Sequence, residues 1–142
     1  MLLLDTSGLL CYVHKSELQH IQAVKFLDTA SYCLTHNYVL AEFVALALVR
    51  RFPRQSTLTF VSDLLDNPDI EVVWVDESLH QEAVNLLMKR SDKTYSLCDA
   101  VSFVLMQQRG IREALTTDHH FEQEGFRRLL VSLNFVVKFS VL

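Results

Sequence analysis

Four acidic residues in this sequence follow or interrupt apolar segments. They are Asp5, Glu42, Asp99 and Asp118. Carboxylate oxygens are the ligands that a hard cation such as Mg²⁺ prefers, and this ion is typically held by a few carboxylates while it keeps several waters. If the fold brings the four side chains together, the chemistry open to them is metal-assisted hydrolysis.

Each acid also has a simpler structural explanation. Asp5 and Asp118 could be helix N-caps, and Ser96 with Asp99 resembles a capping box. Glu42 is harder to explain in this way, because it is the only charged residue in the helical segment NYVLAEFVALALV. A helix that is apolar all round is expected to be mostly buried, and a buried carboxylate is costly unless a cation compensates its charge. Glu42 therefore favours the metal site.

Short apolar strands alternate with helical patterns along the chain. The expected strands are 1–5, 32–35, 71–75, 114–117 and a last one from about Leu129. The expected helices begin at Ser16, at Asn37 as a cap, and at about 54, 78 and 96, with a short helix before the last strand. This alternation predicts a mostly parallel sheet of about five strands with helices on both faces.

The topology explains how the four acids could meet. A parallel α/β sheet places its functional crevice at the carboxyl ends of the strands. Asp5 ends the first expected strand and Asp118 follows the fourth, so both lie at that edge. The helix with Asp99 leads into the fourth strand, and the helix with Glu42 leaves the second. Both helices therefore start from the same edge, and we expect one acidic crevice there.

Four segments of the chain resemble, in order and spacing, the PIN-domain nucleases, and most closely the small VapC-type toxins of toxin–antitoxin pairs. The segments are LLLDTSGLL, NYVLAEFVAL, YSLCDAVSFVLM and ALTTDHHFEQEGF, and the resemblance covers about residues 1–130. It implies a three-layer α/β/α sandwich, Mg²⁺- or Mn²⁺-dependent endoribonuclease activity and frequent dimerisation. The acidic positions of the family map onto Asp5, Glu42, Asp99 and Asp118, and Ser7 and Thr117 match positions where the family uses hydroxyls to support the site.

From the residues and the resemblance we expect a metal-dependent endoribonuclease that hydrolyses phosphodiester bonds in RNA. Asp5, Asp99 and Asp118 would hold one or two Mg²⁺ (or Mn²⁺) ions. Glu42 would be a further ligand or would orient the attacking water. The resemblance implies an RNA substrate, a small antitoxin protein as partner and a homodimer.

Two basic clusters could contact RNA phosphates. Lys89, Arg90 and Lys93 lie just ahead of Asp99 in the chain, which makes them the better candidates. The second cluster, Arg50-Arg51 with Arg54, is expected to be a solvated helix end. The pair His119-His120 is expected to contact solvent or phosphate rather than to bind a metal.

Three other classes of protein share parts of this pattern. A phosphatase of the haloacid-dehalogenase type needs a second acid two residues after the first, where this chain has Ser7. A phospho-accepting receiver domain would need paired acids after the first strand, but Asp5 is followed by Thr6. A non-catalytic protein- or RNA-binding module on the same fold needs no metal, and only the intact acidic set argues against it.

Length and composition set further bounds. The 142 residues suit a single domain over 1–142, with 129–142 as an apolar C-terminal strand or tail. The three cysteines are expected to be reduced core residues of a cytoplasmic protein, and Phe43, Phe103 and Trp74 to be core. The net charge of −4 argues against a broad basic face for nucleic acid, and no segment has the length of a membrane span. The apolar start lacks the basic leader of a signal peptide.

Overall fold

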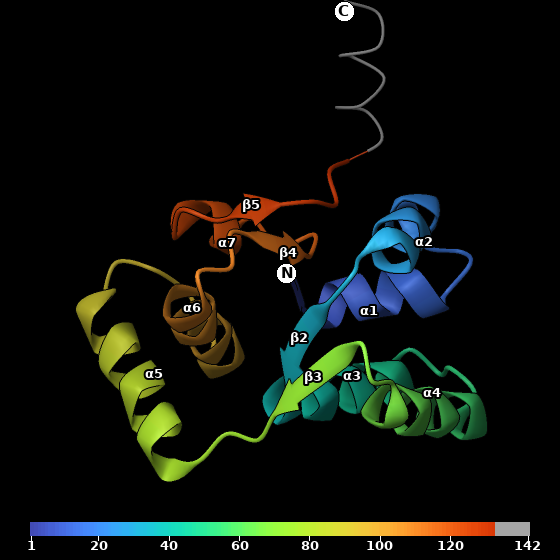
Figure 1. Ribbon diagram of the computed structural model, residues 1–142, viewed down its shortest axis with the longest axis horizontal. Coiled ribbons are helices and arrows are strands. Elements are labelled where there is room, and N and C mark those ends of the chain that lie inside the picture. The colour runs from blue at the N-terminus through green and yellow to red at the C-terminus, as the bar shows by residue number, and fades with distance from the viewer. Residues whose placement is uncertain (133–142) are drawn as a thin grey trace, which may run out of the picture.

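The computed structural model describes residues 1–132 and shows one parallel sheet between two layers of helices (Figure 1). The strands are β1 (Leu2–Leu4), β2 (Cys33–His36), β3 (Ile70–Val73), β4 (Glu113–Leu115) and β5 (Arg127–Arg128), in the sheet order β3-β2-β1-β4-β5. All four pairings between neighbouring strands are parallel. The helices are α1 (Thr6–Val13), α2 (His20–Thr29), α3 (Asn37–Val49), α4 (Arg54–Asp66), α5 (Glu77–Lys89), α6 (Leu97–Arg109) and α7 (His120–Gln123). The predicted α/β/α fold is confirmed.

The central strand β1 has an apolar core on each side. Leu2 and Leu4 belong to the core that includes residues of α1, α2, α3 and α4, whereas Leu3 belongs to the core with α5, α6 and α7. Successive side chains of a strand point to opposite faces of the sheet. The continuous apolar run at the start of the chain is therefore the pattern of a strand that is covered on both faces.

Helix α1 was not predicted from the sequence, and Gly8 explains how it packs. A Cβ atom at Gly8 would lie 1.9 Å from the carbonyl oxygen of Leu115, which no side chain can tolerate. Glycine therefore lets the backbone of α1 approach the end of β4 directly. This close approach joins the segment after Asp5 to the segment that leads to Asp118.

Several boundaries differ from the predicted ones. Helix α2 begins at His20 rather than Ser16, and β5 ends at Arg128, before the predicted start of the last strand. His36 rather than Asn37 occupies the N-cap position of α3. The Asn37 side chain instead accepts a hydrogen bond from the backbone N–H of Val75 at 2.7 Å, which ties α3 to the end of β3.

Burial also corrects two sequence interpretations. Trp74, expected in the core, is 66% exposed because it follows β3 at the edge of the sheet. Helix α3 is not buried all round, since Val49 near its end is 77% exposed. Phe43 and Phe103 are buried as predicted, and all three cysteines are free and buried.

The structure describes little of the apolar C-terminal segment. Most of the apolar segment 129–142 lies outside the described residues, which end at 132, so its proposed role as a strand or tail stays a prediction. Within residues 1–132, no helix has both the length and the apolar character needed to cross a membrane.

Candidate active site

Asp5 lies directly after β1, and its side chain faces other polar groups instead of capping α1. It occupies the N-cap position of that helix, but its carboxylate makes no capping hydrogen bond. Oδ2 accepts a hydrogen bond of 2.7 Å from Thr116 Oγ1 and a weak one of 3.5 Å from Ser7 Oγ. Burial, with the nearby charges of Asp99 and Glu42, raises the pKa of Asp5 to about 7, although the Thr116 hydrogen bond opposes the shift. This geometry supports a site residue rather than a cap.

Hydroxyl groups hold this carboxylate in place. Ser7 Oγ lies 3.1 Å from Thr116 Oγ1 and accepts a hydrogen bond of 2.9 Å from the backbone N–H of Thr117. Thr116 Oγ1 in turn accepts a hydrogen bond of 3.0 Å from the N–H of Asp118. Thr116 was missed in the sequence, where only Thr117 was named. The fully buried hydroxyl belongs to Thr116, because neighbouring residues at a strand end point in opposite directions.

Asp99 is both a capping residue and a member of the acidic cluster. The capping box is complete, because Ser96 Oγ accepts from the Asp99 N–H and Asp99 Oδ2 accepts from the Ser96 N–H, each at 3.0 Å. The same Oδ2 lies 3.2 Å from His120 Nδ1. Burial and then the negative charge of Asp118 raise the pKa of Asp99 above its usual range, against the hydrogen bonds from Ser96 and His120. Asp99 therefore caps α6 and also lies among the acids at the carboxyl edge.

His120 bridges two of the acids, whereas the sequence predicted that the His119-His120 pair contacts solvent or phosphate. Its Nδ1 lies 3.2 Å from Asp99 Oδ2 and 3.3 Å from Asp118 Oδ1, and its ring is 16% exposed. Its Nε2 lies 3.0 Å from Thr94 Oγ1. The possible ligand atoms of Asp118, His119 and His120 lie within 4.8 Å of one another, and within residues 1–132 this is the only group of three or more His, Cys, Asp or Glu residues close enough to hold a metal ion. It contains Asp118 but none of the other three predicted acids.

Glu42 reaches the cluster from α3, where its side chain is half-buried. Its negative charge contributes to the raised pKa of Asp5 and of the buried Cys98 thiol. The charges of Asp5 and Asp99 also act on Cys98. Asp5 therefore senses the charges of both Asp99 and Glu42, and Asp99 in turn senses the charge of Asp118.

The four acids offer the type of ligand that a divalent cation takes, although their oxygens do not form a group within 4.8 Å of one another in the described structure. Carboxylate oxygens are the atoms that Mg²⁺ and Mn²⁺ take from proteins. Within residues 1–132, no Lys or Arg side chain forms an ion pair with any of the four acids. Like charges that are buried together without a counter-ion destabilise the charged state, and a bound cation would relieve this repulsion.

Of the basic residues expected to contact RNA, Arg90 lies beside the end of α7. Arg90 makes two hydrogen bonds, of 3.0 and 3.1 Å, to the carboxylate of Glu124, and Lys93 lies 3.4 Å from Asp92. Lys89 forms no ion pair within the described part of the chain. The loop that follows these residues reaches the acidic cluster through Thr94 and His120. Contact with RNA stays a prediction for all three.

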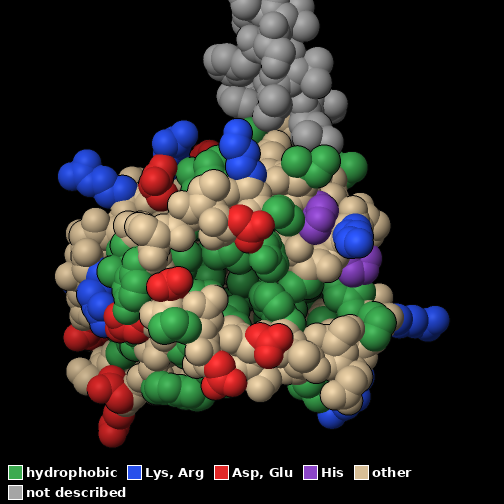
Figure 2. Space-filling model, turned by 45° about the vertical axis from the view of Figure 1, so that its right-hand side comes forward, with side chains coloured by type: hydrophobic (Ala, Val, Ile, Leu, Met, Phe, Trp, Pro, Cys, Tyr) green, Lys and Arg blue, Asp and Glu red, His purple; other side chains and the backbone are tan. Residues whose placement is uncertain are grey.

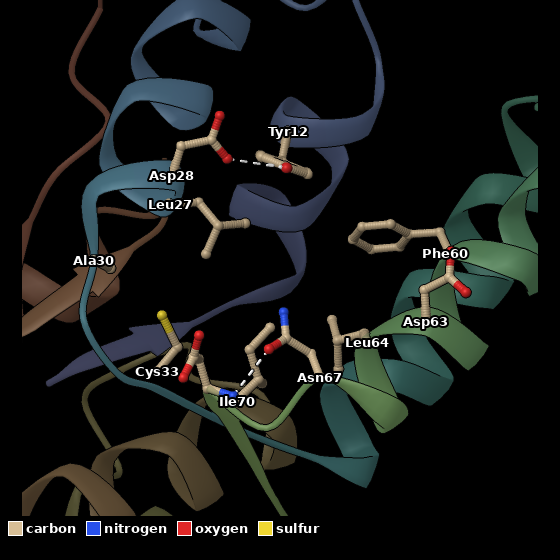
Figure 3. Close-up of a pocket in the computed structure, with 11 residues that line it drawn as sticks. Tyr12, Leu27, Asp28, Ala30, Cys33, Phe60, Asp63, Leu64, Asn67 and Ile70 are labelled. Carbon is tan, nitrogen blue, oxygen red and sulfur yellow. Dashed lines mark hydrogen bonds between the residues drawn. The ribbon is translucent and has the colours of Figure 1, made fainter.

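A second group of acids lies at the opposite edge of the sheet, in a pocket of about 430 Å³ (Figure 3). Cys33 and Ile70, the first residues of β2 and β3, lie in its wall, so it opens at the amino ends of the strands. Hydrophobic side chains form much of its lining, and Figure 2, which brings this side of the molecule forward, shows a hydrophobic hollow with acidic side chains around it. The acids of the pocket are Asp28, Asp63 and Asp69.

The protein is a parallel α/β domain whose buried acids lie at the carboxyl ends of the strands, which is the edge where such sheets usually place their functional site. The chain belongs to the PIN domain family, because the model of that family matches residues 2–126. It is 28% identical over 127 residues to the 23S rRNA-specific endonuclease VapC20 of Mycobacterium tuberculosis, in strains CDC 1551 and H37Rv, over 89% of this chain and 95% of the relative. A crystal structure of M. tuberculosis VapC20, described as a Sarcin-Ricin loop cleaving toxin, superposes with a TM-score of 0.81 at 25% identity, over 89% of this chain and 96% of that one.

Proposed function

We propose that this protein is a metal-dependent endoribonuclease and the toxin of a toxin–antitoxin pair. The observation that carries the proposal is the buried Asp5 carboxylate, which shares one edge of the sheet with Asp99, Asp118 and Glu42. Membership of the PIN domain family and the similarity to an rRNA-specific endonuclease over nearly the whole chain support the same activity.

In this proposal, Asp5, Asp99 and Asp118 hold one or two Mg²⁺ or Mn²⁺ ions, and Glu42 is a further ligand or orients the attacking water. When bound, the metal lowers the pKa of a coordinated water and neutralises the charge that develops on the scissile phosphate. The hydroxyls of Thr116 and Ser7 orient the Asp5 carboxylate through their hydrogen bonds.

The charge of the site also bears on the substrate. An acidic crevice repels RNA phosphates until a cation fills it, so the metal is needed for binding as well as for chemistry. The phosphate must descend into the crevice, and single-stranded or looped RNA can do this more easily than a duplex. Lys89 and Lys93 are the proposed contacts to flanking phosphates, together with Arg90 if RNA displaces Glu124 from it.

The proposal includes two protein partners. A small antitoxin covers the acidic crevice and inserts an Arg or Lys side chain, whose charge substitutes for that of the metal. A second copy of the chain forms a homodimer, and the protein acts in the cytoplasm as a single domain over residues 1–142. Saturating antitoxin should abolish cleavage of labelled RNA, and undiminished cleavage would overturn this part. Sedimentation velocity measures the oligomeric state.

The central test compares RNA cleavage by purified wild type in Mg²⁺ or Mn²⁺ and in EDTA. Cleavage should require the metal, and Asp5→Asn and Asp118→Asn should each reduce it by at least ~100-fold, because loss of a direct ligand costs more than the tenfold to hundredfold effect of outer residues. Asp63→Asn, a matched change in the pocket at the opposite edge, should cleave like wild type. Equal cleavage by all four proteins would instead indicate a contaminating nuclease or a non-catalytic binding module.

A further inference from the structure

A small cavity adjoins the acidic cluster and shares residues with it. It measures about 150 Å³ and opens beside Ser7 and Thr117, which also support the acids. This is far more space than one water needs, and it leaves room for a small planar group such as a nucleobase. The lining residues are Ser7, Leu10, Cys11, Glu17, Gln19, Arg50 and Thr117.

Three separate segments build this cavity. One runs from α1 into its connection with α2 and supplies the residues from Ser7 to Gln19, the second is Arg50 after the end of α3, and the third is Thr117 after β4. His20 Nδ1 lies 2.8 Å from the carbonyl oxygen of Cys11, which ties the start of α2 to α1 behind the cavity. The walls are therefore held in place by the fold.

Arg50 and Glu17 give the cavity both hydrogen-bond donors and acceptors. Arg50 Nη1 lies 2.6 Å from Glu17 Oε1, and this is a single hydrogen bond rather than a bidentate pair. Within residues 1–132, the other guanidinium N–H groups and Glu17 Oε2 make no further hydrogen bond or ion pair. Arg50, expected to be a solvated helix end, is thus placed in a polar pair next to the candidate active site.

The charge of this pair argues for a base rather than a phosphate. Arg50 alone would attract a phosphate, but Glu17 cancels its charge and would repel a second anion at this distance. A nucleobase is neutral and presents donors and acceptors side by side. Guanine offers O6 and N7 as acceptors, which arginine recognises with two N–H groups, and its N1–H and N2–H₂ are donors that a carboxylate can accept.

We propose that this cavity is a nucleobase subsite that selects guanine next to the scissile phosphate. The inference rests on the proposed ribonuclease function and adds the sequence preference of the same site. Arg50 donates to O6 and N7 of the base, and Glu17 accepts from its Watson–Crick edge. Adenine lacks O6 and N1–H, so it leaves Arg50 and Glu17 with unpaired groups.

The test uses short RNAs that differ in one base beside the cleaved bond. Wild type should cleave the guanine RNA at least ~5-fold faster than the adenine RNA, which is the lower end of the discrimination that a good bidentate pair gives. Glu17→Gln should lower this ratio several-fold, because an amide replaces one acceptor by a donor. Arg50→Lys should also lower it, because it keeps the charge but loses the planar pair of donors. Arg54→Ala, which removes an exposed charge at the start of α4, should leave the ratio unchanged.

Two outcomes would overturn the subsite. Wild type could cleave both RNAs equally, or Arg50→Lys could keep the ratio while Arg50→Gln slows cleavage of both RNAs alike, which is the behaviour of a phosphate contact. If wild type cleaves no RNA, the ribonuclease proposal fails, but the subsite is still tested by NMR in EDTA. Guanosine monophosphate should then shift the amide signals of Gln19 and Thr117 more than adenosine monophosphate, and equal shifts would contradict the guanine subsite.

Discussion

The two edges of the sheet each carry a group of carboxylates, yet the groups differ in burial and in surroundings. At the carboxyl edge, Asp5 is 4% and Asp99 is 7% exposed, and each senses the charge of another acid. At the amino edge, Asp28, Asp63 and Asp69 are exposed. Water and salt screen exposed charges, whereas buried charges repel one another strongly. The comparison shows that burial, more than the number of acids, distinguishes a candidate metal site from an acidic surface.

The hydrogen bonds of the two groups lead to the same distinction. Asp28 accepts from the hydroxyl of Tyr12 at 3.1 Å, and the N–H of Asp69 donates to Asn67 Oδ1 at 2.9 Å, and both contacts are exposed (Figure 3). Asp5, in contrast, is held by Thr116, which lies 111 residues away in the sequence. Both groups bring together segments that are distant in the sequence, and the difference is that the hydrogen bond to Asp5 is buried whereas those of Asp28 and Asp69 are exposed.

The largest expected difference between the two edges is in the pH dependence of stability. Burial raises the pKa of Asp5 from 3.8 to about 7, so the folded state binds a proton that the unfolded state releases. This stabilisation is fully present below about pH 4 and is lost as the pH rises toward 7. In EDTA, the free energy of unfolding of wild type should fall, relative to Asp5→Asn, by up to about 1.4 kcal/mol per pH unit.

Urea unfolding at several pH values measures this effect. Asp63→Asn, at the amino edge, should follow the wild-type pH dependence. Parallel curves for wild type and Asp5→Asn would show that Asp5 has an ordinary pKa and that the contrast between the edges is not electrostatic.

A smaller effect is expected from the packing that assembles the carboxyl edge. Gly8→Ala places a Cβ against the backbone of Leu115, so α1 must move away from β4. We expect a loss of about 3 kcal/mol, at the upper end for overpacking, and reduced RNA cleavage because Asp5 and Thr116 separate. Gly110→Ala has open space but a φ of +64°, so it should lower the melting temperature without changing cleavage per folded molecule. Wild-type cleavage by folded Gly8→Ala would contradict this role of the contact.

The smallest effect separates the two roles of Asp99. Asn at this position can keep a capping oxygen but removes the buried charge. In EDTA near pH 7, Asp99→Asn should therefore have a slightly higher melting temperature than wild type, which corresponds to a gain in the free energy of unfolding of less than about 1 kcal/mol. Mg²⁺ should stabilise wild type by mass action and the mutant less. Asp76→Asn is the matched control, because Asp76 only caps α5, through a hydrogen bond of 2.8 Å from the Leu79 N–H, and should melt lower.

Thermal unfolding with EDTA and with Mg²⁺ gives both measurements. If Asp99→Asn melts lower than wild type in EDTA and responds equally to Mg²⁺, then Asp99 acts as a cap alone and the proposed metal site loses its third acid.

Local patterns in the sequence determined the architecture. Continuous apolar runs predicted β1 and β4, helical periodicity and Gly110 predicted α6, and the alternation of the two predicted a parallel sheet with its acids at the carboxyl edge. These features depend on the properties of neighbouring residues, which a sequence displays directly. Asp99 also showed its capping box in the sequence, because Ser96 is three residues away.

Contacts between distant segments were decided only by the tertiary structure. Nothing near Gly8 in the sequence indicates that Leu115 will lie against it, so the packing of α1 on β4 could not be predicted. Trp74 is exposed because its strand lies at the edge of the sheet, and strand order is not a local property. The pairing of Arg50 with Glu17 beside Ser7 likewise joins segments that meet only when α1 and α3 pack together. Periodicity predicts which face of an element is buried, but the partner it packs against depends on the whole chain.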